Sequence, residues 1–380
     1  MSPRAIGNCL RANKELSEEA WDKGADYPRQ YRTGELMAHR PAEHFEAHAA
    51  HLCRLGGLAL TALGQYELVH PQLTLLSNHE HTLFRVDVNT TAPAHHQRFV
   101  LRIHDPTVFD PDSVAVELEW LTALARDTPV QVPQPVATPA GAFLIHASHP
   151  DVPESRMCVL FRWVSGRHLR KKLYPGVLQR LGQSIGHLHN YSEHFRPSRG
   201  RIGRRWDWER VFGGQSIVGP ASSWPLLSSD QQILFRATAE RVRATMQRLG
   251  EEPSVFGLIH ADIHTNNYLV ERGGIGLIDF EDCGWGYYLY DLAVVLDEIE
   301  AEYVEQAQVL RDALLHGYRQ IRPLSADHEV LLNVFIAMRL AELVRWFGSS
   351  NKPEFEPSTA SLLKQATHYM SHLLDSPVAG

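Results

Sequence analysis

A short strand-rich stretch between long helical segments is the feature that most constrains how this 380-residue chain can fold. Apolar residues at 256–259 run into the polar loop His260-Ala-Asp-Ile-His-Thr-Asn-Asn267, and a second apolar run begins at Tyr268. Gly273 and Gly274 then mark a turn before the strand that ends at Ile278-Asp-Phe280. This pattern predicts short strands joined by a tight turn, with the polar loop held at a strand end.

The preceding half of the chain has the alternation of apolar and polar residues that is typical of strands. Residues 83–88 and 98–104 predict an antiparallel hairpin, and residues 142–146 and 157–163 predict a second strand pair. The segment Asp110-Pro-Asp-Ser113 carries helix-start signals between the two pairs. We therefore expect a small sheet with one inserted helix, preceded by a helix near 43–63.

After Gly166 the pattern becomes mainly helical. Helix-length apolar periodicity covers four segments, 178–194, 229–249, 301–319 and 327–347. The change from sheet to helices at Val164-Ser-Gly166 suggests a boundary there, and the length of the chain suits two lobes. We predict an α+β fold with an extension at 1–42, a sheet lobe at 43–164 and a mainly helical lobe at 165–380.

Charge and cysteine content exclude several classes of protein. A net charge of −7 disfavours a nucleic-acid-binding protein and is compatible with a cationic partner. The four cysteines form no C-x-x-C pair, which favours reduced thiols and a cytoplasmic location. No run approaches the roughly 20 apolar residues that span a bilayer, so no membrane association is expected.

The polar loop and the following strand combine side chains that suit phosphoryl transfer. Asp262 and Asn267 are separated by four residues, and Asp279 follows twelve residues after Asn267. Their oxygen atoms are the hard ligands that Mg²⁺ prefers, and phosphoryl transfer depends on positioning and charge neutralisation. A zinc site at His260-x-Asp-x-His264 is the rival interpretation. It leaves Asn267 and Asp279 without a role, so the magnesium interpretation is favoured.

These motifs resemble those of the aminoglycoside phosphotransferase and choline kinase family, which has the two-lobed protein-kinase-like fold. The resemblance is strongest over residues 257–267 and 276–286 and continues through Leu289-Tyr-Asp-Leu-Ala293. It implies that Asp262 is the catalytic base, that His260 orients the loop, and that Asp291 braces it. It also implies that Asn267 and Asp279 bind the metal.

The same resemblance assigns nucleotide-binding residues in the sheet lobe. Arg102 would hold the α- and β-phosphates of ATP in place of the usual lysine. Its carboxylate partner would be Glu117, which shares a helical face with Leu121 and Leu124. Two further pairs complete the assignment, Ser77 and Asn78 at a glycine-free phosphate loop and Arg162 and Val164 at the adenine-binding linker.

The sequence thus predicts an ATP- and Mg²⁺-dependent kinase that phosphorylates a hydroxyl of a small molecule. The acceptor classes are amino alcohols, choline-like compounds, homoserine-like amino acids and aminoglycosides. A protein serine/threonine kinase is one alternative, although Tyr290 begins the next motif only eleven positions after Asp279, which leaves little room for a peptide-docking loop. A catalytically silent nucleotide-binding protein is the other alternative.

Overall fold

The computed structural model describes residues 42–78, 81–88, 97–107, 110–169, 173–213, 227–349 and 356–375. These residues group into two compact units. The first contains residues 42–110 and 133–164, and the second contains residues 111–132 and 165–375. Within the described residues, no helix has the length and apolar character needed to cross a membrane.

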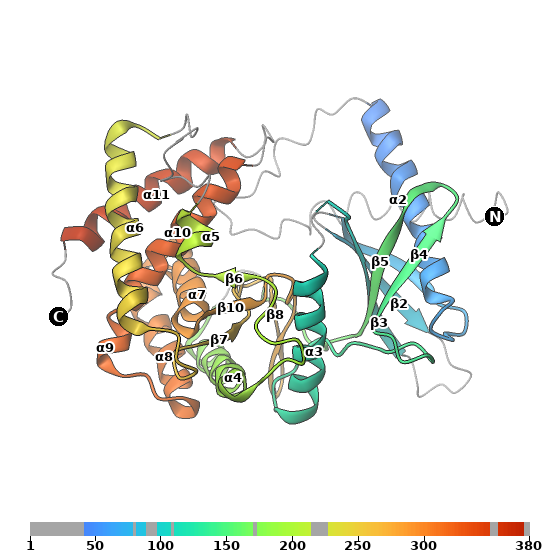
Figure 1. Cartoon of the computed structure of the whole chain (residues 1–380), viewed down its shortest axis with the longest axis horizontal. Coiled ribbons are helices and arrows are strands. Elements are labelled where there is room, and N and C mark those ends of the chain that lie inside the picture. Colours follow the sequence, from blue (N-terminus) through green and yellow to red (C-terminus); the bar gives the residue numbers. More distant parts are fainter. Residues whose placement is uncertain are drawn as a thin grey trace. The chain divides into compact units, whose positions relative to one another are not determined.

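The first unit is a five-stranded antiparallel sheet covered by a helix (Figure 1). Its strands lie in the order β1-β2-β3-β5-β4. The elements are α2 (Ala42–Leu63), β1 (Gln72–Asn78), β2 (His81–Val88), β3 (Gln97–His104), β4 (Leu144–His149) and β5 (Val152–Arg162). The predicted hairpin is confirmed as β2 and β3, and the second predicted pair as β4 and β5.

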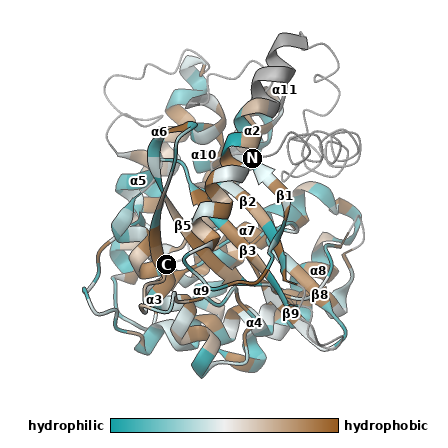
Figure 2. Ribbon diagram, turned by 90° about the vertical axis from the view of Figure 1, so that its right-hand side faces the viewer, coloured by the Kyte–Doolittle hydropathy of each residue, from teal (hydrophilic) through white to brown (hydrophobic). Residues whose placement is uncertain are grey.

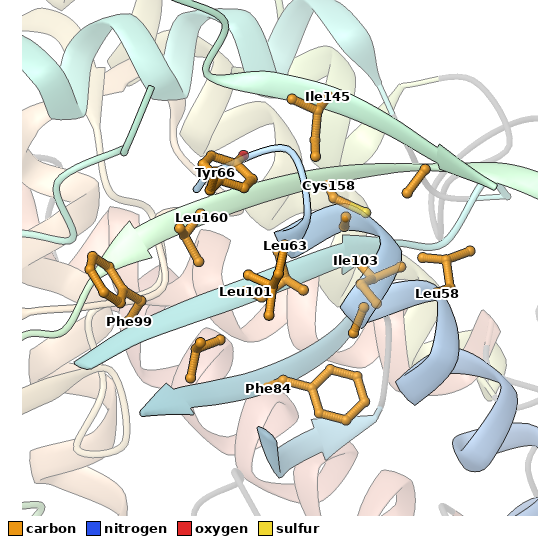
Figure 3. Close-up of a cluster of buried hydrophobic side chains, with 14 of the residues drawn as sticks. Leu58, Leu63, Tyr66, Phe84, Phe99, Leu101, Ile103, Ile145, Cys158 and Leu160 are labelled. Carbon is orange, nitrogen blue, oxygen red and sulfur yellow. The ribbon is translucent and has the colours of Figure 1, made fainter. Parts of the chain in front are cut away.

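The core of this unit lies between α2 and one face of the sheet (Figure 3). Leu58 and Leu63 of α2 pack against Phe84, Leu101 and Leu160 of the three central strands. Alternate strand residues face this core, and Figure 2 shows apolar residues, coloured brown, in the strands of this sheet. The opposite face of β3 carries Val100 and the buried Arg102, because successive side chains of a strand point to opposite faces.

The second unit consists mainly of helices around two small sheets. One sheet has the strand order β6-β10-β7, and the other pairs β8 with β9. The strands are β6 (Arg205–Trp206), β7 (Phe256–Ile259), β8 (Tyr268–Glu271), β9 (Gly274–Leu277) and β10 (Gly284–Tyr287). The helices are α3 (Pro111–Asp127), α4 (Pro175–His194), α5 (Trp208–Phe212), α6 (Ser229–Leu249), α7 (Tyr288–Glu302), η3 (Val304–Gln306), α8 (Ala307–Ile321), α9 (Ala326–Glu329), α10 (Leu332–Ser349) and α11 (Glu356–Asp375).

One close helix pair and one largely buried helix are the main packing features of this unit. Helices α4 and α8 meet at Gly182 and Gly317, where any Cβ atom would collide with the main chain of the partner helix. Helix α7 is buried along residues 288–299, so its apolar residues show no amphipathic period. The expected helix at 301–319 is therefore wrong at its start, because α7 continues through Glu302 and α8 begins at Ala307.

Candidate active site

The polar loop between β7 and β8 is held by a carboxylate of α7. Asp291 accepts main-chain hydrogen bonds from His260 (Oδ2, 3.0 Å) and Ala261 (Oδ1, 2.6 Å). Its Oδ2 also lies 3.0 Å from Nε2 of His189, whose Nδ1 lies 3.0 Å from the Tyr318 hydroxyl. Asp291 and His189 are fully buried. The start of the loop is therefore fixed to α7, and through His189 to α4 and α8.

A second carboxylate of α7 holds the middle of the same loop. Glu298 accepts a hydrogen bond from the main-chain N–H of Thr265 (Oε2, 2.9 Å). It lies seven residues after Asp291, which is two helical turns, so both carboxylates face the loop. Burial raises the pKa of Glu298, and the neighbouring His264 opposes that rise. The i, i+7 spacing from Asp291 is the sequence signal that could have identified Glu298.

Asp262 lies among three side chains that contact its carboxylate. Arg339 of α10 donates from Nη2 to Oδ1 (2.7 Å), and Asn267 donates from Nδ2 to Oδ2 (3.0 Å). His264 Nε2 lies 3.3 Å from Oδ2. Burial alone would raise the pKa of Asp262, but His264 and Arg339 together hold it well below its ordinary value. Asp262 is therefore an ionised, oriented carboxylate that retains some exposure to solvent (21%).

His260 uses both ring nitrogens inside the protein. Its Nε2 lies 3.0 Å from the carbonyl oxygen of Ile278, and its Nδ1 accepts from the main-chain N–H of Asp262 at 3.3 Å. The ring also packs on Phe280, with centroids 4.4 Å apart. These contacts join the loop to the strand end that carries Asp279. Because both ring nitrogens are engaged in these contacts, they also disfavour the zinc interpretation. The described residues contain no group of three or more His, Cys, Asp or Glu side chains that could hold a metal ion.

Two residues of this site have left-handed backbone conformations. Ala261 has φ of 70° and Asp279 has φ of 63°, which few residues other than glycine adopt. Such a conformation costs about 1–3 kcal/mol and persists only where surrounding contacts enforce it. At Ala261 the enforcing contact is the hydrogen bond to Asp291. Asp279 is exposed and follows β9, next to the buried Phe280.

The predicted metal residues have donor atoms that suit a hard cation. Asn267 donates from Nδ2 to both the carbonyl and the carboxylate of Asp262, which turns its Oδ1 away from that residue. The carbonyl oxygen of Asn267 accepts a hydrogen bond (2.9 Å) from the main-chain N–H of Ile278, the residue before Asp279. An amide oxygen and an exposed carboxylate at adjacent strand ends fit Mg²⁺, which keeps several waters and takes few protein ligands.

Glu117 lies in the same unit as these residues. It is buried on α3 (3% exposed), a helix that packs against the metal-side strand end through Trp120 and Phe280, with ring centroids 5.6 Å apart. Arg102, its predicted partner, belongs to the first unit. The pairing of Arg102 with Glu117 therefore stays a prediction.

In the first unit, Arg102 is buried and its guanidinium lies 5.0 Å from the centre of the Phe161 ring. The glycine-free loop predicted at Ser77 and Asn78 is wrong in its placement, because both residues belong to β1, which extends to Asn78, and β2 begins at His81. Ser77 and Asn78 pair with Leu83 and Thr82, and the Thr82 hydroxyl donates to Asn78 Oδ1 at 2.7 Å.

A small cavity of about 90 Å³ lies at the end of this hairpin. It is lined by Asn78, His81, His104 and Arg156, among others. The rings of His81 and His104 are in edge contact, with centroids 4.6 Å apart. Burial, with Arg102 and His81 nearby, lowers the pKa of His104 far below its ordinary value. Asn78 is thus the predicted loop residue that lines a polar cavity.

The predicted adenine-binding positions lie at the end of β5. Arg162 is exposed, and its main-chain N–H donates to the carbonyl of Gln134 at 2.8 Å. Val164 is half-buried in the irregular segment that follows. A role for either residue in adenine binding stays a prediction.

Arg339 is the residue nearest to Asp262 that the sequence analysis missed. The periodicity of residues 327–347 predicted a helix that only packs against the core. Arg339 is nevertheless flanked by Met338 and Leu340, both fully buried. A single arginine inside such an apolar segment is the signal that could have identified it, because a buried cation requires a partner.

Comparison with known proteins places this site in a family. The model of the phosphotransferase enzyme family matches residues 77–324. An uncharacterized protein of Deinococcus radiodurans is 30% identical over 74% of this chain and 80% of its own length. The amicoumacin kinase of Bacillus subtilis is 22% identical over 64% of this chain and 71% of its own length.

A solved structure supports the same assignment. The structure of a microcompartment-associated aminopropanol kinase is 27% identical, with a TM-score of 0.68, and covers 83% of this chain and 95% of that one. It confirms the predicted kinase-like α+β fold. The family match covers the loop at 260–267, Asp279 and Asp291, and it confirms the prediction of a small-molecule kinase. The chain belongs to the phosphotransferase enzyme family.

Proposed function

We propose that the protein transfers the γ-phosphoryl group of ATP, with Mg²⁺, to a hydroxyl of a small amino alcohol. The observation that carries this proposal is the setting of Asp262. Its carboxylate is ionised, partly exposed and oriented by Arg339, Asn267 and His264. Such a group is suited to orient an acceptor hydroxyl and accept its proton.

Asn267 and Asp279 are the proposed metal ligands. Their oxygens would hold Mg²⁺, which when bound supplies positive charge to the phosphate oxygens. The hydrogen bond from Asn267 Nδ2 to Asp262 ties the base to the metal side of the site. His260 keeps the two segments in register through Ile278. The chemistry is positioning and electrostatic stabilisation, which phosphoryl transfer requires.

The residues proposed to bind ATP are those predicted from the sequence. We propose that Arg102, paired with Glu117, holds the α- and β-phosphates. Ser77 and Asn78 of the hairpin are proposed to contact phosphate. Main-chain groups at Arg162 and Val164 are proposed to receive adenine.

The acceptor is proposed to be small because the chain between Asp279 and α7 is short. Strand β10 begins at Gly284 and α7 at Tyr288, so only eight residues lie between Asp279 and a helix that is buried along residues 288–299. A protein kinase needs an ordered peptide-docking segment at this point. The amicoumacin kinase among the relatives supports a small-molecule acceptor, and the similar aminopropanol kinase supports an amino alcohol.

The proposal is tested by measuring ADP release with a panel of acceptors. The panel contains 3-aminopropan-1-ol, choline, homoserine, an aminoglycoside and a generic protein substrate, each with and without Mg²⁺. We expect Mg²⁺-dependent ADP release with at least one small acceptor and none above background with the protein.

Two variants and a control make this test specific. Asp262→Asn and Asp279→Ala should each abolish transfer while the circular dichroism spectrum stays that of the folded protein. Asp230→Asn, an exposed carboxylate in the first turn of α6, should keep full activity. Near-normal turnover in either site variant, or phosphorylation of the protein substrate alone, would overturn the proposal.

A further inference from the structure

A group of three arginines and two carboxylates lies beside the catalytic segments and therefore has one positive charge in excess. It is defined here as the arginine cluster: Arg204, Arg210 and Arg345, with Asp282 and Glu342. Arg204 forms an ion pair with Asp282. Arg345 donates two hydrogen bonds to Glu342, at 2.8 and 2.6 Å. Two of the three guanidinium groups are therefore neutralised.

Arg210 is the remaining cation of the cluster. Its guanidinium lies 4.5 Å from the centre of the Trp206 ring, and in the described part of the chain no carboxylate comes within ion-pair distance of it. Its buried Nε atom has no hydrogen-bond partner there. Burial, and then Arg204, lower the pKa of Arg210, and Glu342 and Asp282 only partly oppose this. Residues 214–226, which follow α5, contain no charged residue.

Aromatic stacking connects Arg210 with the site of phosphoryl transfer. The ring of Trp206 stacks on that of Tyr290, with centroids 5.4 Å apart, and Trp206 Nε1 donates to the carbonyl of Asp282 at 2.7 Å. Asp282 lies three residues after the proposed metal ligand Asp279. Tyr290 is fully buried next to Arg339 and Asp262, which both act on its pKa. The cluster is therefore continuous with the proposed acceptor side of the site.

The tryptophan rings near the cluster are already occupied by arginines of the chain itself. Arg210 covers Trp206, and Arg243 lies 3.5 Å from the centre of the Trp208 ring. An ammonium group of a substrate would have to compete with these guanidinium groups for the same ring faces. An unneutralised, partly buried guanidinium instead favours an anion, and its planar donors match a carboxylate.

We propose that the acceptor carries a carboxylate in addition to its hydroxyl, and that Arg210 selects for it. The single excess charge of the cluster matches a monoanion. This inference rests on the proposed function, since it concerns the acceptor of the same site. It narrows the acceptor from amino alcohols in general to those that also carry a carboxylate, which are hydroxy amino acids.

The inference is tested with pairs of acceptors that differ only by a carboxylate. L-Homoserine and 3-aminopropan-1-ol form a short pair, and 6-hydroxynorleucine and 5-aminopentan-1-ol form a longer one. We expect kcat/KM to be at least about tenfold higher for the amino acid in one of the pairs, as one charge-assisted hydrogen bond provides. Equal or higher kcat/KM for the amino alcohol in both pairs would overturn the inference and leave the proposed function intact. Absence of ADP release with every acceptor would overturn both.

Substitution of Arg210 assigns the preference to this side chain. In Arg210→Met the ratio of kcat/KM between the two members of the preferred pair should fall about tenfold, through a higher KM for the amino acid, and Arg210→Lys should restore part of it. Arg243→Met is the matched control, because Arg243 also stacks on a tryptophan of this segment but lies outside the arginine cluster. Its ratio should stay within twofold of the unmodified enzyme. A preference that survives in Arg210→Met, with an unchanged Tm, would refute the role of Arg210.

Discussion

Replacement of Asp291 by asparagine tests how the polar loop is held. The carboxylate serves three donors, the main-chain N–H groups of His260 and Ala261 and the ring of His189. Asparagine has the same shape but replaces one acceptor oxygen with an NH₂ group. One or two of the three buried donors therefore lose their acceptor. Each loss costs about 1–3 kcal/mol, so we expect the free energy of unfolding to fall by about 2–4 kcal/mol.

The same substitution should slow catalysis without touching a reacting atom. Ala261 keeps its left-handed conformation through the bond to Asp291, and Asp262 is the next residue. A displacement of Asp262 by about 1 Å is enough to reduce kcat roughly 100-fold. Urea denaturation and ADP release measure the two effects, with the exposed Glu305→Gln as the control. A loss of stability below about 0.5 kcal/mol together with kcat within twofold of normal would refute this account of the loop.

Three further predictions concern other buried contacts. Burial raises the pKa of Asp297 to about 7, so its neutral form stabilises the fold fully below its ordinary pKa and this contribution is lost as the pH rises through 7. Urea titrations should show a loss of about 3 kcal/mol between pH 5 and pH 8, and an equal loss in Asp297→Asn would contradict this. Gly317→Ala places a methyl group against the Gln179 carbonyl of α4, so it should lower the free energy of unfolding by about 1–3 kcal/mol and the Tm with it; an unchanged Tm would refute the close helix contact. Glu298→Ala removes the acceptor of the Thr265 N–H and should cost about 1–3 kcal/mol, whereas Glu298→Gln should keep most of that stability, and equal losses in the two variants would show that the hydrogen bond is not the cause.

Local patterns predicted those elements whose two faces differ. Helix α6 has the predicted limits, Ser229–Leu249, because one side faces solvent and its periodicity is clear. The alternation of apolar and polar residues in β2 and β3 revealed their pairing, because only one face of the sheet packs against α2. Helix α7 lacks such a contrast because it is buried on all sides, so no pattern separated it from the strands before it.

Glycines and an irregular register hid two strands. Strand β10 contains Gly284 and Gly286, which disfavour a strand by propensity. In the structure a Cβ atom at Gly284 would lie 2.5 Å from the main-chain carbonyl oxygen of Arg204, so the close approach of the main chain explains this residue. In β1 the register shifts between Leu75 and Ser77, which breaks the alternation that reveals a strand.

For the candidate site, short motifs identified the residues near one another in sequence but not those that reach it from distant helices. Asp262 and Asn267 are five positions apart and are hydrogen-bonded, as their spacing suggested. Arg339 lies 77 positions from Asp262, and no local pattern connects the two. Contacts of that kind depend on helix packing, which a single sequence does not encode in any short window.

The attachment of the polar loop to α7 has a consequence for its dynamics. Surface loops usually open with little free energy, but here Asp291 and Glu298 bind the main-chain amides of Ala261 and Thr265 from one buried helix. These amides cannot exchange with solvent until their bonds to α7 break, and α7 lies in the core. The loop and the helix therefore form one cooperative unit. Hydrogen exchange at Ala261 and Thr265 should have the slow rates of α7 rather than the fast rates of a loop, so the catalytic segment opens only when the core around it does.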